Sequence, residues 1–161
     1  MRDAVEGDLP AIVQIYNHAI ATRISTAQLE PVSVAQRLPW FHEHARDRHP
    51  LWIVELDGTI AGWFSFHSFI PRCAYRATAE ISVYVHEEFR SRGVGWTLLS
   101  AALDRSPALG FTALLGLIFA GNTASLELFE RAGFTRWGLL PGVAEIEGFK
   151  RDVVILGRHV G

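Results

Sequence analysis

The feature that most constrains this chain is a glycine-containing turn in residues 89–99, FRSRGVGWTLL. Its Arg-x-x-Gly-x-Gly pattern follows a β-rich run and precedes a leucine-rich run typical of a helix. A helix start leaves backbone N–H groups unpaired, and no Ser, Thr, Asp or Asn stands directly before this helix to cap them. The pattern therefore predicts a phosphate site on the exposed amides, with Gly93 and Gly95 allowing close approach and Arg90 and Arg92 adding charge. The alternative is a plain connector with solvated arginines.

Other nucleotide-binding loops fit this turn poorly. A Walker loop requires a lysine after its second glycine, and none is present. A dinucleotide fingerprint requires three glycines after the first strand, whereas this turn has two and lies late in the chain.

Composition narrows the class of protein further. The 161 residues suit one domain, and 49% apolar residues with a net charge of −2 argue against a nucleic-acid partner. Cys73 is the single cysteine, which favours a reducing compartment and excludes an internal disulfide. No His or Cys spacing indicates a metal site. The apolar runs are too short to span a membrane, and the first residues lack a signal-peptide core, so we expect a cytoplasmic protein.

The first third of the chain predicts a strand and two helices. A short strand is expected at residues 1–5, and Asp8 is expected to cap a helix that carries Pro10 in its first turn. SVAQ at residues 33–36 has the form of a capping box and predicts a second helix. Pro39 is expected to limit that helix to its first turn or to kink it.

The remainder predicts strands with two further helices. The dipeptide at 57–58, Asp-Gly, marks the turn of a hairpin, and the strand AEISVYVH follows it. The helix after the glycine turn is expected to end near residues 109–110. An apolar strand, a helix over residues 122–132 closed by Gly133, and one or two terminal strands complete the chain. The order β-α-α-β-β-β-α-β-α-β-β predicts one α/β domain over residues 1–161, with a mixed central sheet and helices on both faces.

Several separated blocks resemble one enzyme family. SVYVHEEFRSRGVGWTLL and GLIFAGNTASLELFERAGF together resemble the acetyl-CoA-binding half of the GNAT N-acetyltransferases. DLPAIVQIYNHAI, LEPVSVAQRLPWF and PRCAYRATAEISVYV are similar to its phosphinothricin and methionine sulfoximine acetyltransferase branch, and the similarity covers nearly the whole chain. The resemblance implies the GNAT fold, acetyl-CoA as donor and a homodimer. It also implies direct acetyl transfer, in a ternary complex, to the primary amine of a small acceptor such as an amino acid or analogue.

The resemblance also implies a set of cofactor-binding residues. The pyrophosphate of coenzyme A would lie on the amides of the glycine turn, and the pantetheine arm would pair with the strand before it. An amide of that strand would stabilise the oxyanion that develops during attack. Asn122 has a second reading as a helix N-cap, and both roles can hold together. The implied residues are Ser82, Val83, Tyr84, Val85, Arg90, Ser91, Arg92, Gly93, Val94, Gly95, Asn122 and Ser125.

Acetyl transfer needs a neutral amine, and Glu80 is the candidate general base. It interrupts an apolar strand, where a carboxylate is costly to bury, and it matches the family's catalytic glutamate. The alternative is a strand-edge glutamate paired with Arg72 or Arg76. Many GNAT enzymes place a tyrosine acid where this chain has Phe129, so we nominate no acid and expect water to protonate the thiolate.

The acceptor site is the least constrained part. The segment FIPRCAYRATAE matches the substrate-holding loop of the branch, which implies Arg72 and Tyr75, with Glu80, as substrate-binding residues. Arg72 would hold a carboxylate or else is a solvated loop arginine. Three departures from the branch pattern put phosphinothricin itself in question as acceptor: Ala27, Gln28 and Ile70. Trp40, Trp52, Trp63 and Phe66 could line the acceptor site, but core packing is the default for aromatic residues at strand and helix spacing. His67 is expected to be a core or solvated histidine.

Two other functions stay open at this point. The first is acetylation of a protein N-terminus or lysine, which favours an open acidic groove and fits the Arg72 loop less well. The second is a non-catalytic sensor that binds acyl-CoA. Phe129 at the usual tyrosine position favours the sensor, whereas Glu80 opposes it.

Overall fold

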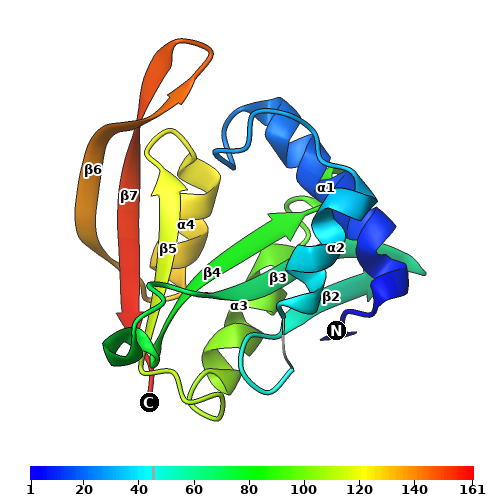
Figure 1. Cartoon of the computed structure of the whole chain (residues 1–161), viewed down its shortest axis with the longest axis horizontal. Coiled ribbons are helices and arrows are strands. Elements are labelled where there is room, and N and C mark those ends of the chain that lie inside the picture. Colours follow the sequence, from blue (N-terminus) through cyan, green and yellow to red (C-terminus); the bar gives the residue numbers. More distant parts are fainter. Residues whose placement is uncertain (45) are drawn as a thin grey trace.

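The computed structural model describes residues 1–44 and 46–161 as seven strands and four α-helices around one sheet (Figure 1). Three short 3₁₀ helices, Glu6–Asp8, Cys73–Tyr75 and Glu87–Phe89, link these elements. The helices are α1 (Leu9–Thr22), α2 (Val34–His42), α3 (Val94–Arg105) and α4 (Thr123–Arg131). The strands are β1 (Arg2–Asp3), β2 (Leu51–Leu56), β3 (Thr59–Ser68), β4 (Thr78–Val85), β5 (Ala113–Phe119), β6 (Thr135–Ile146) and β7 (Phe149–His159).

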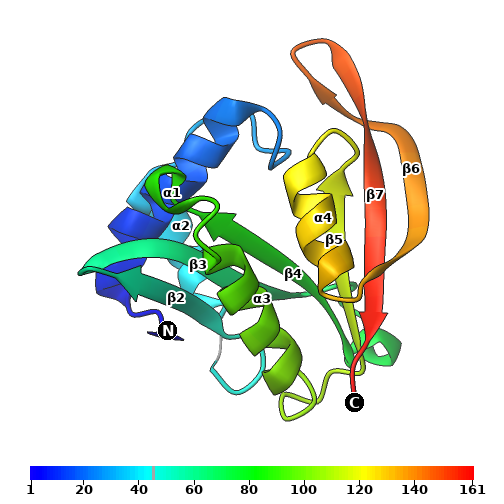
Figure 2. The same cartoon turned by 180° about the vertical axis from the view of Figure 1, so that it is seen from behind.

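The strand order places an opening at the middle of the sheet. The order is β1-β2-β3-β4-β5-β7-β6, and every neighbouring pair is antiparallel except β4 and β5. That parallel pairing is short, because it joins only Thr78–Glu80 to Ala113–Leu115. Beyond Glu80 the two strands diverge, as both views of the ribbon show (Figures 1 and 2).

Helices cover both faces of the sheet and bury two apolar clusters. Residues on successive positions of a strand point to opposite faces, so Trp63 packs with α1 and α2 whereas Phe64 packs with α3 and α4. Leu9 and Ile12 of α1 are buried on the first face, and Leu98 of α3 is buried on the second. The predicted order of elements, the mixed sheet and the helices on both faces are confirmed.

Pro39 does not limit the second helix to its first turn, the first of the two predicted effects. The Ser33 capping box is present, since the Gln36 amide donates to the Ser33 hydroxyl at 3.2 Å and the Ser33 amide donates to the Gln36 side chain at 2.7 Å. The helix nevertheless passes Pro39 and ends at His42. Packing offsets the hydrogen bond lost at Pro39, because Leu38, Trp40 and Phe41 contact the apolar cluster that contains the buried residues of α1.

Two expectations about helix ends are wrong. Helix α3 ends at Arg105 rather than near residues 109–110, because Pro107 has no N–H with which to continue the helix. Asp8 makes no side-chain cap on α1. Its carboxylate instead accepts bonds from Arg2 at 2.7 and 2.9 Å and from the Val5 amide at 2.8 Å, which fastens the first strand to the helix.

Candidate active site

The predicted glycine turn forms an open, uncapped start of α3. Gly93 is the N-cap residue with a φ of +82°, and no side chain caps the helix. A Cβ placed on Gly93 would meet no atom within 4 Å. Within the described chain, the backbone N–H groups of residues 91–96 donate to no protein oxygen. The turn therefore presents unpaired donors at the positive end of a helix dipole, which is the geometry that binds an anion.

Close packing holds this helix start against the central strands. A Cβ on Gly62 of β3 would lie 2.8 Å from the Tyr84 carbonyl oxygen and 2.9 Å from Cγ1 of Val94. Gly95 lies similarly close to α4, since its Cβ would be 3.0 Å from Cδ2 of Leu128. Because Gly62 and Gly95 have no side chain, the start of α3 can lie close to the central strands and to α4.

Glu80 lies where the central strands separate. It is the last residue of β4 that pairs with β5, opposite Leu115, and its side chain is half-buried. Burial raises the pKa of the Glu80 carboxyl above its ordinary value. Within the described residues its carboxylate makes no hydrogen bond or salt bridge, including to Arg72 or Arg76. A carboxylate of this kind is available to accept a proton near neutral pH.

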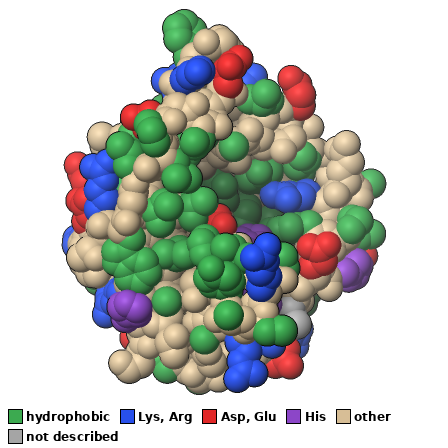
Figure 3. Space-filling view, turned by 60° about the vertical axis from the view of Figure 1, so that its left-hand side comes forward, with side chains coloured by type: hydrophobic (Ala, Val, Ile, Leu, Met, Phe, Trp, Pro, Cys, Tyr) green, Lys and Arg blue, Asp and Glu red, His purple; other side chains and the backbone are tan. Residues whose placement is uncertain are grey.

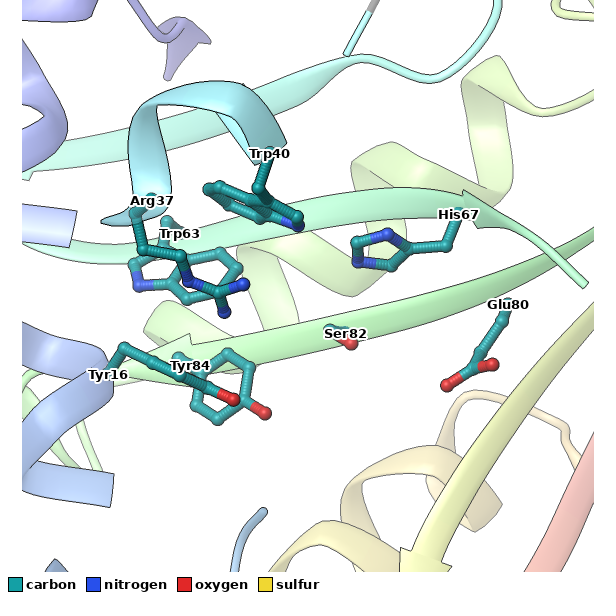
Figure 4. A pocket seen from close by; sticks show the side chains of 8 residues that line it. All are labelled: Tyr16, Arg37, Trp40, Trp63, His67, Glu80, Ser82 and Tyr84. Atoms are coloured by element: carbon teal, nitrogen blue, oxygen red, sulfur yellow. The ribbon is translucent and has the colours of Figure 1, made fainter. Parts of the chain in front are cut away.

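Glu80 opens into a small pocket between the sheet and the first two helices (Figure 4). Its volume is about 230 Å³. Since a water molecule occupies ~30 Å³ in the liquid, this space suits a small molecule. The space-filling view shows the hollow between apolar side chains, with acidic and basic groups in and around it (Figure 3). Eight residues line it: Tyr16, Arg37, Trp40, Trp63, His67, Glu80, Ser82 and Tyr84.

Aromatic rings and one arginine form the wall away from Glu80. The Arg37 guanidinium carbon lies 4.3 Å from the Tyr16 ring centroid and 4.4 Å from that of Trp40. The Tyr16 ring meets Tyr84 edge-on at 5.3 Å, and Trp40 meets Trp63 at 5.6 Å. Ring contacts of this kind restrict side-chain motion and hold the cation in one position.

His67 is the cross-strand neighbour of Glu80 and shares its face of the sheet. Its Nε2 lies 2.7 Å from the buried Ser65 hydroxyl, and its ring is 5.1 Å from that of His44. Burial, with the positive charges of His44 and Arg37, lowers the pKa of His67 to about 4. The imidazole is therefore neutral at physiological pH and does not neutralise Glu80.

The other implied cofactor residues lie on the two faces of β4, in the glycine turn and at the start of α4. Ser82 and Tyr84 line the pocket, whereas Val83 and Val85 pack toward α3 and α4. Arg90, Ser91 and Arg92 are exposed in the turn, and Val94 is buried. Asn122 is buried and caps α4, because its Oδ1 accepts the Ser125 amide at 3.2 Å.

The implied acceptor loop lies outside the pocket. Arg72 and Tyr75 are exposed around the 3₁₀ helix that follows β3, and neither lines the cavity. Tyr75 packs edge-on against Phe69 at 5.9 Å. Phe129 is buried beside Phe134, so the position of the usual tyrosine acid is apolar here.

Sequence reasoning missed part of the pocket wall. Trp52 and Phe66 are core residues as expected, but Trp40 and Trp63 line the cavity as well as packing. Tyr16, Arg37 and His67 were not singled out as site residues. The available signal was the spacing of Arg37 and Trp40, one helical turn apart, which places both on one helix face.

The comparisons with known proteins agree with this arrangement. The model of the acetyltransferase (GNAT) family matches residues 12–134. YwnH of Bacillus subtilis, provisionally named a phosphinothricin acetyltransferase, is 47% identical over 99% of this chain and 98% of its own. The L-methionine sulfoximine/L-methionine sulfone acetyltransferase of Pseudomonas aeruginosa is 34% identical over 97% and 91%. A Sinorhizobium meliloti phosphinothricin acetyltransferase, solved in complex with acetyl-CoA, superposes with a TM-score of 0.93 at 30% identity over 99% and 87%.

The chain belongs to the GNAT family of acetyltransferases. Within that family it is an N-acetyltransferase related to the phosphinothricin and methionine sulfoximine acetyltransferases. Across residues 1–44 and 46–161, no helix is long and apolar enough to cross a membrane. In the same residues, no group of three or more His, Cys, Asp and Glu side chains is placed to hold a metal ion.

Proposed function

We propose that this enzyme transfers an acetyl group from acetyl-CoA to the primary amine of a small acceptor, an amino acid or an analogue of one. The observation that carries the proposal is the position of Glu80. A half-buried carboxylate, which makes no hydrogen bond or salt bridge in the described part of the chain, lies where β4 and β5 separate, and it opens into a pocket of about 230 Å³. The pocket is sized for an acceptor rather than for coenzyme A.

The donor would occupy the divergence between β4 and β5. The open amides of residues 91–96 would receive the pyrophosphate, with Arg90 and Arg92 exposed beside them. Ser82, Val83, Tyr84 and Val85 pair with β3 but with no residue of β5, so those of their peptide groups that face away from β3 are available to bind the pantetheine arm. Asn122 and Ser125 begin α4 on the other side of the divergence.

Transfer would then follow in one ternary complex. Glu80 accepts a proton from the acceptor ammonium, and the neutral nitrogen attacks the acetyl carbonyl carbon. A carbon–nitrogen bond forms, and an amide N–H of β4 stabilises the intermediate oxyanion. The nitrogen of this intermediate gives its second proton to water as the carbon–sulfur bond breaks. The thiolate leaves and takes its proton from water, since buried Phe129 offers no acid.

The pocket favours a small acceptor over a protein. Aromatic side chains enclose it, and Glu80 is the single acidic residue among its eight lining residues. Acetylation of a protein N-terminus or lysine would be better served by an open acidic groove. The unpaired Glu80 carboxylate likewise has no evident use in a sensor that only binds acyl-CoA.

An acceptor panel tests the proposal. Purified enzyme with acetyl-CoA is assayed for release of free thiol with amino acids, methionine sulfoximine, phosphinothricin, and a short peptide with a free N-terminus. We expect turnover with amino acids or their analogues and none with the peptide. Preference for the peptide would support the protein acetyltransferase. Acetyl-CoA binding without turnover of any amine would support the sensor.

We also propose that the enzyme is a homodimer. Large apolar side chains are exposed on the β6–β7 hairpin: Trp137, Leu139, Leu140, Val143 and Phe149. A hairpin that exposes several large apolar side chains is usually covered in solution. Light scattering during size-exclusion chromatography should give twice the monomer mass, and a monomer at micromolar concentration would contradict this proposal.

A further inference from the structure

Arg37 is a cation in the acceptor pocket that has no acidic partner among residues 1–44 and 46–161. Two other half-exposed arginines in the described chain form salt bridges, Arg2 with Asp8 and Arg23 with Glu147. The Arg37 guanidinium is in no such pair and donates to no oxygen of the described residues. A partly buried charge that no protein group neutralises is costly, so a function for it has to be sought.

The rings around Arg37 position it without using its hydrogen-bond donors. Tyr16 and Trp40 contact the cation through their π faces, at 4.3 and 4.4 Å to the centroids. Contacts of this kind leave the five guanidinium N–H donors free. Arg37 is therefore held in place and ready to bind a planar anion through paired hydrogen bonds.

The two charges of the pocket lie apart. Figure 4 shows Arg37 among the aromatic rings at one side and the Glu80 carboxylate at the other, with Ser82 between them. Arg37 comes from α2, whereas Glu80 and Ser82 come from β4. His67 is the other basic residue that lines the pocket, and it carries no charge at neutral pH. The cavity thus has one positive and one negative end.

We propose that Arg37 is the specificity-determining residue that binds the anionic group of the acceptor, and so turns its amine toward Glu80. This inference rests on the proposed function, because it concerns the acceptor of the same reaction. It assigns the role to a helix residue inside the cavity and not to Arg72, which is exposed and outside it. A zwitterion, which carries an ammonium and an anionic group in one small molecule, matches a cavity with one negative and one positive end.

Paired acceptors separate this role from a structural one. Wild type, Arg37→Gln and Arg37→Lys are each assayed with an amino acid that wild type acetylates and with the carboxamide of the same amino acid. Arg37→Gln should lower kcat/KM for the free acid by about 10- to 100-fold, mainly through KM, because a charge-assisted paired bond is lost. It should change kcat/KM for the carboxamide by less than about threefold. Arg37→Lys should recover only part of the lost kcat/KM, because an ammonium cannot form the bidentate hydrogen bonds of a guanidinium.

Arg105→Gln is the matched control. Arg105 also lies over a tryptophan, with its guanidinium carbon 5.1 Å from the Trp52 ring centroid, but it is at the end of α3 and outside the pocket. This variant removes a comparable cation–π contact and should leave both acceptors unaffected. Arg72→Gln tests the rival anchor.

Several outcomes would overturn the inference. An equal loss for acid and carboxamide in Arg37→Gln would mean that Arg37 only supports the pocket. An acid-specific loss in Arg72→Gln, with Arg37→Gln unaffected, would transfer the role to the loop.

A binding experiment covers the case in which wild type turns over no acceptor, which would refute the proposed function. Tryptophan emission, to which Trp40 and Trp63 of the pocket contribute, is then titrated with the amino acid and with its carboxamide. A change in emission with the free acid alone, abolished in Arg37→Gln, would support the binding of the acceptor's anionic group by Arg37 even without turnover. If wild type shows no such change, this role of Arg37 is refuted as well.

Discussion

The open start of α3 yields a prediction with a matched control inside the same chain. Gly93 and Gly110 have almost the same left-handed backbone, with φ of +82° and +81°. At neither residue would a Cβ meet another atom within 4 Å. The two glycines therefore differ in location rather than in strain, since Gly93 begins α3 in the turn and Gly110 follows the helix.

The structure sets the size of each effect. A branched side chain in this backbone region costs about 1–3 kcal/mol, so Gly93→Val and Gly110→Val should lose similar stability. For a chain of this length, each 1 kcal/mol lowers Tm by about 2–4 °C. Only Gly93→Val places a side chain in front of the open amides. The loss of one charge-assisted bond, worth about 1.5–3 kcal/mol, corresponds to a Kd for acetyl-CoA roughly 10- to 100-fold weaker.

Calorimetric titration with acetyl-CoA, together with thermal unfolding of the same samples, measures both quantities. We expect the two variants to unfold at similar temperatures while only Gly93→Val loses affinity. Equal affinity in Gly93→Val and wild type would refute the phosphate site. An equal loss in Gly110→Val would assign the effect to backbone strain.

Three further predictions follow from individual contacts. Arg2 and the Val5 amide lower the pKa of Asp8, so its contribution to stability is present above the unfolded-state value and is lost as pH falls through the folded-state value. Asp8→Asn should therefore destabilise the protein by about 1–3 kcal/mol at pH 7 in urea unfolding, with the difference shrinking as pH falls below the unfolded-state pKa of Asp; a constant difference would contradict this. Asn122→Ala should lose about 1 kcal/mol of stability with its cap and also weaken acetyl-CoA binding, whereas Asn122→Ser should recover stability alone; full recovery of both would limit Asn122 to capping. Burial raises the pKa of Glu80, so its ionisation opposes folding, and Glu80→Gln should unfold at the same Tm as wild type or higher at pH 8; a lower Tm would show that Glu80 has a structural partner.

Local patterns predicted most of the fold. The Asp57-Gly58 turn has positive φ at both residues, as a tight hairpin requires. Asn122 and Gly133 bound α4 as predicted, since capping and left-handed glycine are local effects. The early end of α3 follows from the nearby Pro107, whereas distant contacts decide the length of α2 and the role of Asp8. Packing against α1 carries α2 past Pro39, and a salt bridge to Arg2 diverts Asp8 from capping.

The candidate site was only partly accessible to the same reasoning. Glu80 and the glycine turn could be located because each breaks a local pattern in its own segment. The pocket wall could not, because it combines Tyr16 of α1, Arg37 of α2 and His67 of β3. Those residues come together only when the helices pack on the sheet. Pattern alone also does not reveal that Arg37 lacks an acidic partner, since that depends on every neighbour in space.

The role of Glu80 as proton acceptor is central to this account, and the pH dependence of kcat/KM in wild type and Glu80→Gln tests it most directly. Because the pKa of Glu80 is raised and the ionised form is the base, the wild-type rate should rise as pH increases through that value. Glu80→Gln should be slower by about 10²- to 10⁴-fold near pH 7, and should approach wild type where the acceptor amine is already neutral. Acetyl-CoA affinity should be unchanged. Equal rates for the two proteins across the pH range would contradict the assignment of Glu80 as the base.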